Sequence, residues 1–173
     1  MDSPTLVDTQ GRVVRDLRIS VTDRCNLTCP ICYAESSPHH GVHRSLQQIE
    51  FMLDCVVRNE GEPDVVQISG GEPTIHPDFF AIHDLAKSRP IKHLMVNTNG
   101  IRIATDEAFA NELAARAEHF EVYLQFDSFE REALTPRRGP DLRDIRRRAL
   151  DRLNALGVAT TLVVPLKKGL SDH

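Results

Sequence analysis

Three closely spaced cysteines could bind metal together. Cys25, Cys29 and Cys32 follow the pattern C-x3-C-x2-C, directly after an apolar run at 17–21. Thiolates bind iron well, and short cysteine loops wrap iron–sulfur cubanes. Three thiolates leave one iron of such a four-iron cluster without a protein ligand. The spacing therefore favours a cluster with one iron open to another molecule.

Two other interpretations of these cysteines remain open. A zinc site would need a fourth ligand, such as His39, His40 or His43, and zinc sites usually show paired cysteines. Buried apolar cysteines are the other alternative. The fourth cysteine, Cys55, lies in a helical pattern, and we expect it to be a small core residue.

A second candidate segment, Gly70-Gly71-Glu72-Pro73, follows an apolar run at 65–68. Glycines at the end of a buried strand permit positive φ and let a ligand approach the backbone. A carboxylate after them can accept hydrogen bonds from an ammonium group. Taken alone, the segment could equally be a strand-to-helix turn that Pro73 restricts.

Polar residues also end the next apolar run, at 94–96. Asn97 and Asn99 follow it. The dipeptide Asn99-Gly100 is typical of a turn, whereas the amide of Asn97 could face a cofactor or a substrate.

The run at 122–126 ends in a similar way. Alternation along a strand places Gln125 and Asp127 on one face, and Ser128 follows them. A carboxylate or hydroxyl at this position could hold sugar hydroxyls. Arg138 lies in the next loop and could reach a carboxylate or a phosphate.

Strand-like and helical segments alternate along the chain. The expected strands are 17–21, 65–68, 94–96, 122–126 and 160–164. The expected helices are 46–57 with Ser45 as its cap, 77–86, 105–113, and 142–156 with Gly157 at its end. This alternation predicts an α/β fold of parallel βαβ units. In such folds ligands collect at the carboxyl ends of the strands, where all the candidate residues lie.

Length and composition predict one soluble globular domain. The chain has 173 residues, of which 40% are hydrophobic and 27% are charged. We expect an N-terminal extension at 1–15 and a core domain at 16–173. No apolar run approaches the roughly 18–20 residues of a membrane span, and no signal peptide is expected, so the prediction is cytoplasmic. The net charge of −4 gives no reason to expect nucleic-acid binding.

The cysteine spacing and the Gly-Gly-Glu-Pro segment together resemble the radical S-adenosylmethionine (radical SAM) superfamily. The resemblance implies that Cys25, Cys29 and Cys32 bind a [4Fe-4S] cluster whose open iron chelates S-adenosylmethionine. The other residues expected in cofactor binding are Ile31 near the adenine, Tyr33 directly after the three cysteines, Gly70, Gly71 and Glu72 at the methionine amino group, and Asn97, Gln125, Asp127 and Ser128.

Two branches of that superfamily are similar to different parts of the chain. Residues 16–27 look like the GTP 3′,8-cyclases of molybdenum cofactor biosynthesis. Residues 66–74, 96–102 and 123–127 look like the branch of the tetraether-lipid synthase and the methanopterin-methylating enzymes. Members of both branches carry further cysteine groups, which this sequence lacks, so the substrates of neither branch can be assigned.

The resemblance also predicts the architecture and the reaction. The usual core is a partial (β/α)6 barrel; with about five strands, the chain is expected to be truncated at its C-terminus, or to have its open edge covered by a dimer partner. The implied reaction is reductive cleavage of S-adenosylmethionine, driven by a low-potential electron donor, to a 5′-deoxyadenosyl radical that takes hydrogen from an unidentified small-molecule or peptide substrate. The alternative is a non-catalytic metal-binding or scaffold fragment that needs a partner.

Overall fold

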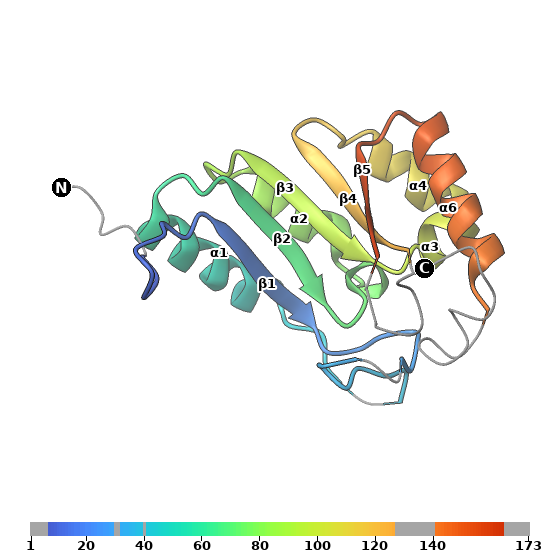
Figure 1. The fold of residues 1–173 in the computed structure, drawn as a ribbon, viewed down its shortest axis with the longest axis horizontal. Helices are drawn as coiled ribbons and strands as arrows, with labels where there is room; N and C mark the ends of the chain where they lie inside the picture. The colour runs from blue at the N-terminus through green and yellow to red at the C-terminus, as the bar shows by residue number, and fades with distance from the viewer. Residues whose placement is uncertain (1–6, 30–31, 40, 127–140, 165–173) are drawn as a thin grey trace.

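Five parallel strands form one curved sheet in the computed structural model, which describes residues 7–29, 32–39, 41–126 and 141–164 (Figure 1). The sheet order is β1-β2-β3-β4-β5, so each strand pairs with its neighbours in the sequence. The strands are β1 (Asp16–Thr22), β2 (Val65–Gly70), β3 (His93–Thr98), β4 (Phe120–Gln125) and β5 (Thr160–Val163). The five predicted strands and their parallel α/β arrangement are confirmed.

Helices connect the strands and pack on one face of the sheet (Figure 1). They are α1 (Leu46–Glu60), the short 3-10 helix η1 (Pro73–Ile75), α2 (Phe79–Lys87), α3 (Ile101–Thr105), α4 (Glu107–Ala114) and α6 (Arg143–Ala155). Within the described ranges, no helix is both long enough and apolar enough to span a membrane.

Alternation along the strands separates an apolar face from a polar face. Ile19, Ile68, Val96 and Val122 lie in register across four strands and are buried in the core against the helices. The alternate positions carry polar side chains such as Gln67. The concave face, which none of the described helices covers, is therefore largely polar.

Local signals in the sequence set the helix ends. Ser45 caps α1 as predicted, because the Gln48 N–H donates to its hydroxyl while the Gln48 side chain accepts from the Ser45 N–H. The helix predicted at 105–113 is confirmed as α4, but the short helix α3 before it was not predicted. Asp106 ends α3, and its carboxylate caps α4 by accepting from the Phe109 N–H, which gives two short helices.

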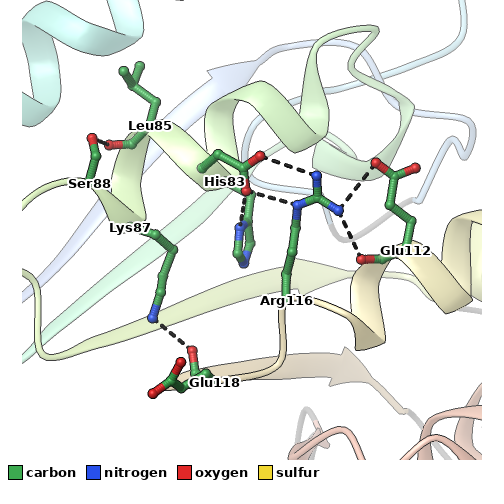
Figure 2. Close-up of polar contacts among 8 residues, drawn as sticks. His83, Leu85, Lys87, Ser88, Glu112, Arg116 and Glu118 are labelled. Carbon is green, nitrogen blue, oxygen red and sulfur yellow. Dashed lines mark hydrogen bonds and ion pairs between the residues drawn. The ribbon is translucent and has the colours of Figure 1, made fainter.

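A charged cluster joins α2 to the end of α4 on the outside of the sheet (Figure 2). The Arg116 guanidinium binds the Asp84 carboxylate at 2.8 Å and the Glu112 carboxylate at 3.3 Å. His83 lies beneath this cluster, is only 1% exposed, and has its ring edge-on to Phe120. Burial lowers the pKa of His83, although the hydrogen bond to Asp84 opposes that change.

We expect the fold to lose stability in mild acid because of His83. In the unfolded chain the imidazole binds a proton near its ordinary pKa of 6.5, whereas the buried ring binds it only at lower pH. The neutral, buried ring therefore costs the fold nothing above about pH 6.5. The free energy of unfolding decreases as the pH falls from 6.5 toward the lower pKa of His83 in the folded protein. Asp84 favours the protonated ring, whereas Arg116 and Lys87 disfavour it.

Urea denaturation at about pH 7.5 and about pH 5.5 tests this expectation. His83→Leu should reduce the difference between the two midpoints relative to the wild type. His119→Gln is the matched control, because the His119 side chain is 69% exposed. An unchanged difference in the His83 variant would assign the acid sensitivity to other groups.

Candidate functional site

A cavity of about 180 Å³ lies at the carboxyl ends of the strands. Figure 1 shows the segment between β1 and α1 folded beside the ends of β1 and β2. The cavity is lined by Arg18, Cys25, Leu27, Cys29, Cys32, Tyr33, Ala34, Ser36, Ser69, Gly70, Gly71, Glu72, Asn97, Thr98, Asn99 and Gln125. The lining includes every site residue predicted from the sequence that the structure describes. Ile31, Asp127, Ser128 and Arg138 lie outside the described residues.

The three clustered cysteines lie on the loop that follows β1. Cys25 is buried, Cys29 and Cys32 are half-buried, and none of the chain's four cysteines, all within the described ranges, forms a disulfide. The loop turns back on itself through a hydrogen bond from the Cys32 N–H to the Cys29 carbonyl at 3.0 Å. Cys55 is half-buried on α1 and does not line the cavity; its prediction as a core residue is therefore met only in part.

Burial strongly affects the Cys25 thiol. It raises the pKa of Cys25 to about 11, a rise that the hydrogen bond from the Leu27 N–H opposes and the nearby Glu72 carboxylate increases. A metal bound to the sulfur would reverse this shift, because it stabilises the thiolate directly. Binding of a cation therefore has to accompany deprotonation of Cys25.

The histidines proposed as zinc ligands lie elsewhere. His39 is exposed, and His43 packs edge-on against the ring of His76 at 4.8 Å; neither lines the cavity. His40 is outside the described residues. Within the described ranges, no three Cys, His, Asp or Glu side chains are arranged as ligands of a single ion. The thiols that line the cavity number three, and this donor set fits a cubane with one open iron.

The two glycines after β2 let the backbone approach the cysteine loop closely. The Gly71 N–H donates to the Thr22 carbonyl at 2.7 Å, and the Glu72 N–H donates to the Arg24 carbonyl at 2.8 Å. A Cβ at Gly70 would overlap the Thr22 carbonyl oxygen, and one at Gly71 would overlap that of Arg24. The glycine pair therefore holds the segment directly before Cys25, in addition to leaving room for a ligand.

The Glu72 carboxylate is buried and bridges the ends of β2 and β3. Its Oε1 accepts hydrogen bonds from the backbone and hydroxyl of Thr74 and from the Thr98 hydroxyl, at 2.7–3.1 Å. Its Oε2 accepts from the Asn99 N–H at 2.8 Å. Burial raises the pKa of Glu72, and these hydrogen bonds oppose the rise. Oε2 keeps a lone pair that could accept from a further donor in the cavity.

Asn97, Gln125 and Tyr33 occupy different parts of the lining. The Asn97 Oδ1 is buried and has no hydrogen-bond partner among the described residues, so it can accept a bond from a ligand. Gln125 lines the wall at the end of β4, and Tyr33 is 84% exposed at the rim.

Sequence reasoning missed several residues of this site, among them Arg18, Ser36 and Asn26. Arg18 lines the cavity from β1 and donates from its Nε to Gln67; alternation with Leu17 and Ile19 could have revealed it. The hydroxyl of Ser36 is buried in the lining without a partner among the described residues. Asn26 binds Asn99 from the cysteine loop, and only the three-dimensional structure shows that contact.

The chain matches relatives with assigned functions over only part of the length of those relatives. The chain is 29% identical over 157 residues to the 7,8-dihydro-6-hydroxymethylpterin dimethyltransferase of Methanocaldococcus jannaschii, covering 90% of this chain and 31% of that enzyme. It is 32% identical over 136 residues to a probable GTP 3′,8-cyclase of Methanocella arvoryzae, covering 75% of this chain and 40% of the relative. The chain thus spans about a third of the length of such relatives. Distant homology to the GTP 3′,8-cyclases and to the methanopterin-type dimethyltransferase, expected from the sequence, is confirmed.

Solved structures share the fold. The chain superposes on Streptococcus suis SuiB bound to S-adenosylmethionine with a TM-score of 0.68 and 18% identity, covering 86% of this chain and 33% of SuiB. It superposes on anSMEcpe with bound AdoMet and a peptide with a TM-score of 0.64 and 23% identity, covering 85% of this chain and 42% of that structure. The predicted partial barrel is confirmed.

The family follows from the sequence as a whole. The profile of the radical SAM superfamily matches residues 19–173, which include the cysteine loop, the glycine–glutamate turn, the second half of β1 and the strands β2 to β5. This family implies a [4Fe-4S] cluster and S-adenosylmethionine. The chain belongs to the radical SAM superfamily.

Proposed function

We propose that this chain is the core of a radical SAM enzyme and that Cys25, Cys29 and Cys32 hold its [4Fe-4S] cluster. The observation that supports the proposal is that the three thiols and the Gly70-Gly71-Glu72 turn line the same cavity. When bound there, the cluster and S-adenosylmethionine supply one-electron cleavage of the C5′–S bond, which yields a 5′-deoxyadenosyl radical able to take hydrogen from a substrate. A low-potential one-electron donor is required.

The protein's own residues bind and orient the cofactor. The Glu72 Oε2, which accepts from the Asn99 N–H, would also accept from the amino group of S-adenosylmethionine. The Asn97 Oδ1, which has no partner among the described residues, would accept from another donor of the cofactor. Tyr33 at the rim and Gln125 at the end of β4 both line the cavity and are proposed to lie beside the nucleoside. Ile31, Asp127 and Ser128 are proposed as further contacts on the basis of the family pattern.

The polar concave face is proposed as the substrate side of the cavity. Arg18 and Ser69 project from this face into the cavity lining. The names of the relatives indicate that they act on a dihydropterin and on GTP, which makes these two compounds the first substrates to try. β1 and β5 are the edge strands of the described sheet, and a further segment or a partner chain is proposed to complete the barrel there.

A search for 5′-deoxyadenosine tests the proposal. The chain is reconstituted anaerobically with iron and sulfide, reduced, and mixed with S-adenosylmethionine, alone and with GTP or 7,8-dihydro-6-hydroxymethylpterin. We expect 5′-deoxyadenosine by mass spectrometry, and we expect none from the Cys29→Ala variant. A protein that binds zinc and forms no brown cluster under these conditions would favour the non-catalytic alternative.

A further inference from the structure

Two asparagine side chains connect the cysteine loop to the end of β3. Asn26 directly follows Cys25, and Asn99 directly follows β3. The Asn99 Nδ2 donates to the Asn26 Oδ1 at 2.7 Å, although the residues lie 73 positions apart. The Asn99 Oδ1 accepts from the Ile101 N–H at 3.0 Å. Because that oxygen is engaged, the amide nitrogen has to face Asn26.

The same asparagine is bonded to Glu72 through its backbone. The Asn99 N–H donates to the Glu72 Oε2 at 2.8 Å, and the two residues are 3% and 1% exposed. A continuous series of hydrogen bonds thus runs from Glu72 through Asn99 to Asn26. Shielding from water strengthens such a network and makes the loss of one member costly.

The series ends beside the first cysteine. The Asn26 Oδ1 lies 4.0 Å from the Cys25 Sγ, and the Leu27 N–H donates to that sulfur at 3.4 Å. Residues that contact a metal ligand without binding the metal themselves orient that ligand. Removing such a residue typically lowers metal affinity or activity by about 10–100-fold. Asn26 and Asn99 occupy this supporting position relative to Cys25.

We propose that Asn26 and Asn99 are positioning residues that couple the Cys25 side of the cavity to its Glu72 side. Placement of the cysteine loop and binding of the cofactor's amino-acid end then depend on one another through this pair. The proposal rests on the proposed function for the identity of the ligands. The backbone bonds from Gly71 and Glu72 to the same loop keep it folded when the pair is broken, so the chain should still assemble a cluster.

Cysteine labelling in the metal-free chain tests the first part of the coupling. Iodoacetamide is applied at a fixed pH, and the rate at each cysteine is read by peptide mass spectrometry. Asn26→Ala and Asn99→Ala should each increase labelling of Cys25 about fivefold, the effect of one lost hydrogen bond. The double variant should label no faster than the faster single variant, because both substitutions remove the same contact.

Two further variants serve as controls. Asn26→Asp keeps an oxygen that accepts from Asn99, so it should label no faster than the wild type. Asn59→Ala removes an asparagine bond of similar length on α1, from its Nδ2 to the Cys55 carbonyl at 2.6 Å, and should leave the Cys25 rate unchanged. Equal Cys25 rates in the wild type and both single alanine variants would overturn the proposal.

The protein that carries its cluster tests the second part of the coupling, which is the binding of the cofactor. S-adenosylmethionine is titrated into the reduced cluster protein, and the change in its electron paramagnetic resonance spectrum is followed. Asn26→Ala and Asn99→Ala should retain iron but need about tenfold more cofactor for the same change. No spectral change in the wild type would overturn the proposed function. A normal wild-type titration with unaltered cofactor requirement in both variants would overturn the coupling alone.

Discussion

Replacing any one of Cys25, Cys29 and Cys32 with alanine is expected to abolish assembly of an iron–sulfur cluster. The cavity presents these three thiols and no fourth cysteine, so the loss of one leaves two sulfur ligands for a cluster that needs three from the protein. We expect iron and acid-labile sulfide after anaerobic reconstitution to fall to background, together with the visible absorbance of the cluster.

Cys55→Ala is the matched control for this series. Cys55 is half-buried on α1 and does not line the cavity, so we expect wild-type iron and sulfide content. Cluster absorbance that persisted at wild-type level in all three cavity variants would refute the ligand assignment. Loss of iron in the Cys55 variant as well would point to a general folding defect.

Gly71→Ala is expected to have the next largest effect, on both stability and cluster assembly. The added Cβ would overlap the carbonyl oxygen of Arg24, and the obstacle is backbone that cannot rotate away as a side chain could. The segment before Cys25 has to move, which breaks the hydrogen bonds to Thr22 and Arg24. We expect a loss of about 2–3 kcal/mol in the free energy of unfolding and a lower iron content.

Gly61→Ala separates steric overlap from backbone strain. Gly61 has a φ of +69° at the end of α1, and nothing lies within 4 Å of its missing Cβ. Alanine there should cost about 1 kcal/mol through backbone conformation and leave the iron content unchanged. Urea denaturation and iron analysis of both variants make the comparison. Equal losses in both properties would show that the approach of Gly71 to the loop is unimportant.

The sheet could be predicted from the sequence because its signals are local. Each strand is a short apolar run bounded by polar or glycine residues, and the candidate site residues follow those runs directly. Helix α3 was missed, because it has only five residues and directly follows the Asn99-Gly100 pair, which was interpreted as a turn. A segment this short has too few residues to show a helical period.

The partners of the buried polar groups could not be predicted. Glu72 was expected to face a ligand, yet three of its four hydrogen bonds to Oε1 and Oε2 come from Thr98, Asn99 and the Thr74 hydroxyl. Asn99 was expected to form a turn, and it does cap the Ile101 N–H, but it also binds Asn26. The contacts of Glu72 with Thr98 and Asn99, and of Asn99 with Asn26, join residues that are distant in the sequence, and no periodicity or spacing encodes them.

The in-order sheet has a consequence for how the protein is made. Because each strand pairs with its sequence neighbours, a growing chain can add βα units one after another without waiting for a distant segment. Within the described ranges, the hydrogen bonds that hold the cysteine loop come from β1, β2, the loop itself and the turn after β3, all before residue 102. These hydrogen bonds can therefore form while β4 and β5 are still to be synthesised, and the packing of Cys25 and Leu27 against Leu142 is added later.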